Sequence, residues 1–159
     1  MTRATFAAGC FWAVEAAFRK HPGVVTTQAG YTGGEWEHPT AADVNSGRTG
    51  HAEAVDLEFD DNVISYDQLL EVFWECHDPT SLNRQGTDIG PQYRSAIFFH
   101  TPEQRTAATA SRDRLQSSGR LTRRIVTQIA PASAFWRAEE RHQRYIERHG
   151  EGGAAQAIC

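Results

Sequence analysis

The sequence predicts one α/β or α+β domain, in which a single mixed sheet is covered by helices in a two-layer arrangement. Stretches with helical spacing of apolar residues interleave along the chain with short β-branched or alternating stretches. The 159 residues match the size of one ordinary domain. Since 40% of them are hydrophobic, the chain can bury a core of its own.

The first third of the chain predicts strand, helix and strand in that order. Residues 5–8 form a short strand, and residues 10–20 form a helix whose apolar side chains recur at helical spacing. Residues 24–29 are β-branched and predict a strand, whereas the glycine-rich residues 30–34 predict a turn or loop. Residues 35–51 are polar and irregular, so no element is predicted there.

The middle of the chain repeats this order. Residues 52–59 alternate between two faces, which predicts a half-buried strand. Residues 65–68 (SYDQ) form a capping box that opens a helix ending near residue 77. Residues 78–92 form a polar loop of a length that is usually functional or disordered. Residues 95–100 are apolar on both faces and predict a central strand.

The last third predicts one more strand between two helices. Residues 101–104 cap a helix that has proline at its first position. Residues 124–130 predict a strand, and residues 136–149 predict the final helix. The glycine-rich residues 150–159 predict a flexible tail. The chain therefore divides into a body of residues 1–149 and this short tail.

Composition excludes several classes of function. With a net charge of −4, the chain lacks the basic footprint of a nucleic-acid-binding protein. No apolar run is long enough to span a membrane and the N-terminus lacks a secretory pattern, so we expect a cytoplasmic protein. The three cysteines lie far apart without metal-ligand spacing, which argues against a zinc site or a disulfide framework. In a reducing compartment, thiols that matter are usually catalytic or redox-active.

Cys10 is the first candidate for chemistry. It follows a predicted strand and Gly9, and it opens a predicted helix. The unpaired N–H groups and the dipole of a helix N-terminus stabilise a thiolate, which is the reactive form of cysteine. The alternative is a buried cysteine that packs as a small hydrophobe.

Glu53 is the second candidate. The alternation of its strand places it on the same face as Val55, Leu57 and Phe59. Burial on an apolar face raises the pKa of a carboxylic acid, which can then donate a proton near neutral pH. The alternative is a hydrated carboxylate at the frayed start of the strand.

The other two cysteines have different environments. Cys76 shares one helical stripe with Leu69, Val72 and Phe73, which predicts a core residue. Cys159 follows several glycines at the end of the tail. A thiol on a flexible arm can reach a thiol elsewhere, and the alternative is an idle exposed cysteine.

The long polar loop ends with further polar candidates. Asp88 and Tyr93 could hydrogen-bond a polar group beside the thiol, and their alternative roles are a turn residue and a half-buried strand aromatic. His51 and His77 each lack a partner at metal-ligand spacing, so we predict structural roles for both.

Six ordered segments carry a family resemblance and cover nearly the whole chain up to about residue 149. They are Gly9-Cys10-Phe11-Trp12 with Glu15; Gly30-Tyr31-Thr32-Gly33-Gly34; Thr49-Gly50-His51-Ala52-Glu53-Ala54-Val55; Phe73-Trp74 with His77-Asp78-Pro79-Thr80; Arg84-Gln85-Gly86-Thr87-Asp88 with Gln92-Tyr93-Arg94-Ser95-Ala96-Ile97; and Phe135-Trp136 with Ala138-Glu139 and His142-Gln143. In this order they resemble peptide methionine sulfoxide reductase of the A type. The resemblance implies a ferredoxin-like two-layer sandwich and no metal or organic cofactor.

The resemblance also implies a reaction. The substrate is the S epimer of methionine sulfoxide, free or in proteins, and thioredoxin recycles the enzyme, which we expect to be a monomer. By similarity Cys10 attacks the sulfoxide sulfur and becomes a sulfenic acid. The acid is Glu53, and Cys159 is the candidate that forms a disulfide with Cys10. The remaining residues assigned by similarity bind the substrate. Phe11 and Trp12 form the pocket for its S-methyl group. The sulfoxide oxygen is bound by Tyr31, Asp88 and Tyr93.

The sequence departs from the family pattern at two places, and rival functions stay open. Ala13 stands where the family often has glycine, and the tail carries one cysteine in place of two. A small thiol or thioredoxin could therefore resolve the sulfenic acid directly. The rivals are a different thiol enzyme, such as a peroxidase or hydrolase, and a non-catalytic redox sensor that uses a Cys10–Cys159 switch.

Overall fold

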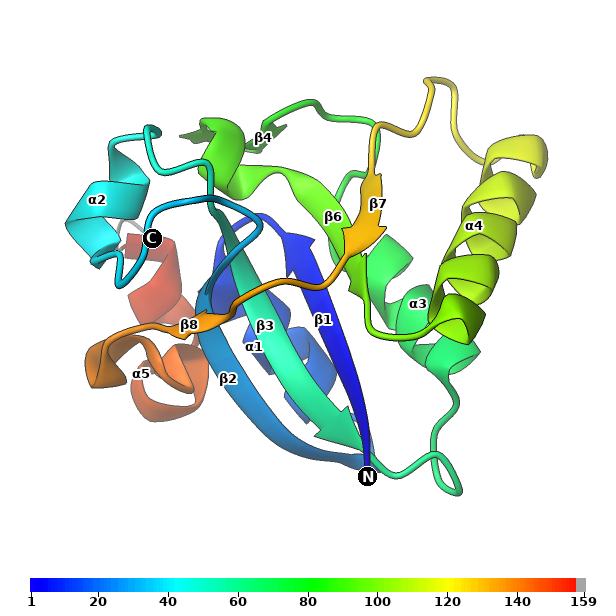
Figure 1. Ribbon diagram of the computed structural model, residues 1–159, viewed down its shortest axis with the longest axis horizontal. Coiled ribbons are helices and arrows are strands. Elements are labelled where there is room, and N and C mark those ends of the chain that lie inside the picture. Colours follow the sequence, from blue (N-terminus) through cyan, green and yellow to red (C-terminus); the bar gives the residue numbers. More distant parts are fainter. Residues whose placement is uncertain (157–159) are drawn as a thin grey trace.

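The computed structural model describes residues 1–156 and the side chains up to residue 150. Figure 1 shows a six-stranded sheet with helices packed against it. Its strand order is β7-β6-β1-β3-β2-β8, and every neighbouring pair is antiparallel except β6 and β7. The strands are β1 (Thr2–Ala8), β2 (Val24–Thr32), β3 (Ala52–Phe59), β6 (Ser95–Phe99), β7 (Gln128–Pro131) and β8 (Trp136–Arg137). The predicted mixed sheet covered by helices is confirmed.

Within residues 1–156, five α-helices lie against or beside the sheet, and smaller elements fill the loops. The helices are α1 (Phe11–Arg19), α2 (Ala41–Asn45), α3 (Tyr66–Glu75), α4 (Pro102–Ser117) and α5 (Tyr145–Gln156). The smaller elements are the hairpin strands β4 (Arg84–Gln85) and β5 (Asp88–Ile89) and the 3₁₀ turns η1 (Pro91–Tyr93) and η2 (Glu140–His142). The hairpin and η1 lie inside the long polar loop of residues 78–92.

The main core lies between the sheet and the helices behind it in Figure 1. Strand β1 alternates, so Ala4, Phe6 and Ala8 face this core. The ring of Phe6 stacks on Phe18 of α1 with centroids 4.9 Å apart, and lies 5.4 Å from Phe73 of α3. These contacts attach α1 and α3 to the strand that leads into Cys10.

The opposite face of the sheet carries small residues. They form a second cluster that the β7–β8 connection crosses in Figure 1. The cluster consists of Ala7, Ala52, Ala54, Ala96 and Phe98, with Ala130, Ala132 and Phe135 packed against it. Small side chains let this connection lie close to the strands, so both faces are covered without a second helical layer.

The prediction of a turn at residues 30–34 is wrong for its first half. Strand β2 continues through Gly30, Tyr31 and Thr32, which pair with β3. A Cβ at Gly30 would meet the Trp136 carbonyl oxygen and would lie 2.5 Å from the Phe135 ring. Glycine therefore marks the close approach of β8, and it does not break the strand. The capping box of Thr40 and Asp43 that opens α2 was also not predicted.

The prediction of one helix over residues 136–149 is wrong. The segment contains β8, η2 and only the start of α5. The Gln143 side chain accepts from the Ala29 N–H and donates to the Ala29 carbonyl, both at 2.9 Å. Glu15, buried on α1, accepts from the Arg144 N–H at 2.7 Å. These long-range bonds override the local helical pattern.

Candidate active site

Cys10 occupies the N-cap position of α1, where strand β1 ends and the helix begins. The preceding Gly9 has φ +92°, a left-handed conformation that strongly favours glycine. Cys10 is half-buried against the main core. The sequence-based prediction that this thiol stands at a helix N-terminus is confirmed. In general, the dipole of a helix N-terminus favours the thiolate of a reduced cysteine placed there.

Glu53 lies on β3 with only 2% of its surface exposed. The Phe11 N–H donates to its Oε1 at 3.2 Å, so the carboxyl group lies beside the first turn of α1. Burial is the largest influence and raises the pKa of Glu53 to about 8, with a further increase from the charge of Asp88 and an opposing effect of the Phe11 bond. The predicted burial and raised pKa are both confirmed, because the strand pleat turns Glu53 toward the core.

Tyr31 is the direct cross-strand partner of Glu53, on β2, so the two side chains share one face of the sheet. Its ring lies 5.7 Å from the ring of Phe11. Its hydroxyl donates to Glu139 Oε1 at 3.0 Å, and burial followed by the Glu139 charge raises the pKa of Tyr31. The hydroxyl proton is thus held by Glu139 in this structure.

Glu139 is a residue that our sequence analysis named only as part of a motif. Its second carboxylate oxygen accepts from the Ala41 N–H at 3.1 Å, at the start of α2. Partial burial raises its pKa, but hydrogen bonds, including those from Ala41 and Tyr31, outweigh this and hold the pKa below its usual range. One ionised carboxylate therefore joins the Tyr31 hydroxyl to α2. No local periodicity could have shown this, since the partners lie about a hundred positions away.

His142 and Trp12 form a second pair that the structure brings together. Trp12 Nε1 donates to His142 Nδ1 at 3.0 Å. Because indole nitrogen is only a donor, the proton of neutral His142 sits on Nε2. That Nε2 is buried and has no hydrogen-bond partner among the described residues. Burial lowers the pKa of His142, which favours the neutral ring.

These residues line a pocket of about 350 Å³. Trp12 also stacks on Tyr145 at the start of α5, with ring centroids 3.8 Å apart. The lining residues are Phe11, Trp12, Tyr31, Ala41, Asn45, Glu53, Arg141, His142, Tyr145 and His149. The pocket therefore has aromatic walls, a protonated acid and polar groups, which suits a ligand with an apolar end and a polar oxygen.

Asp88 and Tyr93 come from the loop between α3 and β6. Tyr93 is buried on η1, and burial followed by the charges of Glu53 and Asp88 raises its pKa to about 12. Burial raises the pKa of half-buried Asp88. Glu53, Asp88 and Tyr93 therefore influence one another electrostatically, which places the loop near the acid.

Cys76 has a different environment from Cys10. Cys76 caps the C-terminus of α3, where its Sγ donates to the Phe73 carbonyl at 3.3 Å and burial raises its pKa to about 12. Such a thiol is inert at neutral pH, in agreement with a packing role. Cys159 lies outside the described residues. His51 and His77 bond to backbone or serine groups, as expected for structural histidines.

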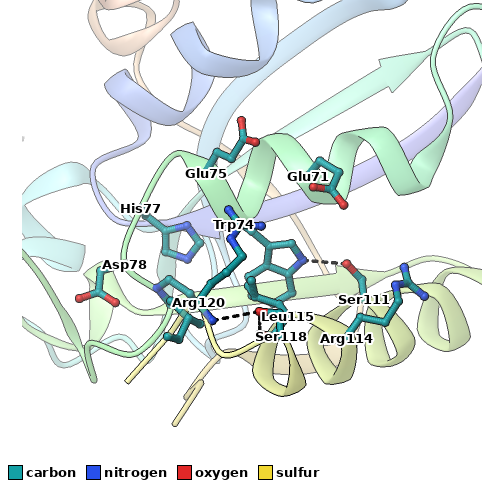
Figure 2. Close-up of a pocket in the computed structure, with 12 residues that line it drawn as sticks. Glu71, Trp74, Glu75, His77, Asp78, Ser111, Arg114, Leu115, Ser118 and Arg120 are labelled. Atoms are coloured by element: carbon teal, nitrogen blue, oxygen red, sulfur yellow. Dashed lines mark hydrogen bonds between the residues drawn. The ribbon is translucent and has the colours of Figure 1, made fainter. Parts of the chain in front are cut away.

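A separate pocket of about 460 Å³ lies between α3 and α4 (Figure 2). Its wall contains Trp74, whose Nε1 donates to Ser111 Oγ at 2.8 Å. None of the predicted site residues that the structure describes lines it. Among residues 1–156, no group of three or more histidines, cysteines and acids could hold a metal ion. No helix in the described part is long and apolar enough to cross a membrane.

The family model for peptide methionine sulfoxide reductase matches residues 2–158. The chain belongs to the peptide methionine sulfoxide reductase family. Peptide methionine sulfoxide reductase MsrA of Geobacter sulfurreducens is 59% identical over 152 residues, which are 96% of this chain and 94% of the relative. The corresponding protein of Methanothermobacter thermautotrophicus is 60% identical over 147 residues, 92% of this chain and 87% of the relative. This reductase is thus of the A type, as its motifs indicated.

Solved structures agree with the fold of this reductase. Reduced Mxr1 of Saccharomyces cerevisiae is 31% identical with a TM-score of 0.88, covering 99% of this chain and 88% of that one. Methionine sulfoxide reductase A of Corynebacterium diphtheriae is 32% identical with a TM-score of 0.81, covering 99% and 76%. Mxr1 has also been solved in complex with Trx2, at 25% identity and a TM-score of 0.64, covering 89% and 83%.

Proposed function

We propose that this reductase converts the S epimer of methionine sulfoxide, free or in proteins, to methionine, and so repairs oxidised proteins. The observation that carries the proposal is the placement of Glu53, a buried acid with a pKa of about 8, against the first turn of the helix that Cys10 opens. The helix start supplies a nucleophile and the protonated Glu53 supplies an acid at neutral pH.

The first step transfers oxygen from the substrate to Cys10. The Cys10 sulfur forms a bond to the sulfoxide sulfur, and Glu53 protonates the sulfoxide oxygen to make it a better leaving group. The oxygen ends on Cys10 as a sulfenic acid, so the Cys10 sulfur is oxidised by two electrons and the substrate sulfur is reduced by two. As the oxygen moves to the Cys10 sulfur, the bond between the two sulfurs breaks and methionine leaves. The proton that the Cys10 thiol loses on attack replaces the one that Glu53 gave to the oxygen.

The pocket and the loop that carries Asp88 and Tyr93 supply the groups that hold the substrate. Phe11 and Trp12 wall the apolar side, where the methyl group on sulfur would lie. Asp88, Tyr93 and Tyr31 bind the polar end. Because the Tyr31 proton is held by Glu139, Tyr31 can donate to the sulfoxide oxygen only after its hydroxyl turns away from that carboxylate.

The second step regenerates the thiol. Cys159 condenses with the Cys10 sulfenic acid to give a disulfide and water, and thioredoxin then reduces that disulfide. The complex of the related Mxr1 with Trx2 supports a thioredoxin partner. Helix α5 begins with Tyr145 stacked on Trp12, so the segment toward Cys159 starts at the pocket edge. Residues 1–149 act as the catalytic domain and residues 150–159 as its resolving tail, in a cytoplasmic monomer that needs no metal or organic cofactor.

A single-turnover assay without reductant tests this reaction. Pre-reduced protein receives the S epimer of methionine sulfoxide, and methionine formed and thiols lost are counted for wild type and Cys159→Ser. We expect one methionine and two thiols lost in wild type, with Cys10 linked to Cys159 in a peptide map. Cys159→Ser should give the same methionine but lose one thiol, to a trappable sulfenic acid. Absence of methionine in wild type would contradict the reductase and favour the redox sensor.

A further inference from the structure

The β4–β5 hairpin that carries Asp88 has little support of its own. Each strand contains two residues, and the turn between them includes Gly86 at φ +60°. Ile89 is exposed to 66%, so the hairpin brings almost no apolar side chain to the core. An isolated two-stranded hairpin is marginally stable in water. Its position beside Gly9 therefore depends on contacts to the rest of the domain.

The Gln85 side chain makes the contacts that fix the hairpin. Its Oε1 accepts from the Asp78 N–H at 3.0 Å, and its Nε2 donates to the Asp78 carbonyl at 2.7 Å. Asp78 is itself held in place, because the adjacent His77 pairs with Ser95 Oγ at the start of β6, at 2.7 Å. Figure 2 shows His77 and Asp78 together where α3 ends. Gln85 thus attaches the hairpin to the segment that follows α3, which His77 joins to β6.

The aliphatic part of Gln85 also lies against Gly9. A Cβ built on Gly9 would be 2.8 Å from Gln85 Cγ and 2.9 Å from Gln85 Cβ. Such distances leave room for the Gly9 hydrogen and nothing larger. Gln85 therefore touches the residue immediately before Cys10 with its aliphatic part, while its carboxamide bonds to Asp78.

The register of the hairpin relates this contact to the acid. Gln85 is the cross-strand partner of Asp88, so fixing one residue fixes the other. The charge of Asp88 in turn acts on Glu53. We propose that Gln85 is a positioning residue that, given the proposed function of Cys10 and Glu53, sets the place of Asp88 relative to both. The reduction of methionine sulfoxide does not itself require a carboxamide at this position. The role of Gln85 follows from its contacts with Asp78, Gly9 and Asp88.

Two glutamine-to-methionine variants test the role. Gln85→Met keeps the stem against Gly9 and removes both hydrogen bonds. The matched control is Gln116→Met, because Gln116 bridges a loop far from the site in the same way, accepting from the Ile125 N–H at 2.7 Å and donating to the Arg123 carbonyl at 3.1 Å. Thermal unfolding confirms that each variant folds, and kcat/KM for methionine sulfoxide is measured across pH.

We expect Gln85→Met to lower kcat/KM by about tenfold or more, since small displacements of reacting groups are costly. The alkaline limb of its kcat/KM profile should move to lower pH, because a displaced Asp88 no longer raises the pKa of Glu53. Asp88→Asn should move this limb in the same direction. Gln116→Met should keep the wild-type profile. Gln85→Ala, which also loses the contact with Gly9, should lose more activity than Gln85→Met.

Two results would overturn the role of Gln85. One is a wild-type profile in both Gln85→Met and Gln85→Ala while wild type reduces the substrate normally. The other is an equal loss in Gln85→Met and Gln116→Met without a pH shift, which would mean general destabilisation. If wild type forms no methionine, the proposed function fails and the role of Gln85 fails with it. If wild type is active and only the Gln85 result is contrary, the role of Gln85 fails alone.

Discussion

The Phe11 N–H donates to Glu53 Oε1 across 3.2 Å, and this bond joins strand β3 to the first turn of α1. Phe11 directly follows Cys10, so the group that holds the acid belongs to the residue next to the nucleophile. The same bond lowers the pKa of Glu53, but burial outweighs it. The acid is therefore both oriented and protonated at neutral pH, which is the combination that sulfoxide chemistry needs.

Replacing Glu53 by glutamine should remove the acid and keep the shape. Oxygen transfer in a single turnover should slow by about 10²- to 10⁴-fold, the usual contribution of a positioned acid. In wild type the activity should fall as pH rises through about 8, where Glu53 loses its proton. Stopped-flow measurement of methionine formation from pre-reduced protein checks both points. An unchanged rate in Glu53→Gln would exclude Glu53 as the acid.

Glu53 should also make stability depend on pH. Its pKa rises from 4.5 to about 8 on folding, so the folded chain holds a proton that the unfolded chain releases. This contribution is complete below 4.5 and is lost as pH rises through about 8. The free energy of unfolding of wild type should therefore fall relative to Glu53→Gln across that window. Urea unfolding of both proteins under reducing conditions measures the difference, and parallel pH profiles would contradict it.

Two tyrosine-to-phenylalanine variants should behave in opposite ways. Tyr31→Phe removes a hydroxyl bonded to Glu139 and should lower kcat/KM, with a loss of about 1 kcal/mol in stability. Tyr66→Phe removes a buried hydroxyl without a hydrogen-bond partner among the described residues. It should raise the free energy of unfolding by about 1 kcal/mol and leave kcat/KM unchanged. Equal effects of the two variants on activity would contradict a substrate-binding role for Tyr31.

Gly30→Ala should destabilise the domain through a steric clash. The added methyl group would lie 2.5 Å from the Phe135 ring and against the Trp136 carbonyl. Overpacking of this kind costs about 1–3 kcal/mol. In the control Gly119→Ala, nothing lies within 4 Å and only the left-handed backbone at φ +79° is strained, at about 1–2 kcal/mol. Gly30→Ala should also raise KM, because β8 leads directly to Glu139. Wild-type KM in Gly30→Ala would show that β8 tolerates displacement.

Local patterns determined much of this protein. The alternation over residues 52–59 gave the bounds of β3 and the inward direction of Glu53, because a pleat has a period of two. The capping box of Ser65 and Gln68 gave the start of α3, since both of its hydrogen bonds join residues three positions apart. Gly9 and Cys10 likewise gave the start of α1. Each of these signals is complete within a few neighbouring residues.

The tertiary structure decided the features that depend on contacts between segments far apart in the sequence. The sequence predicts a turn at Gly30, but the close approach of β8 makes it part of a strand. The sequence predicts a helix over residues 136–149, but the bonds of Gln143 to Ala29 favour another conformation. The partners of the site residues were equally hidden: Glu139 for Tyr31, and His142 for Trp12. These pairs join groups more than a hundred positions apart, and no periodicity within one element can encode such a contact.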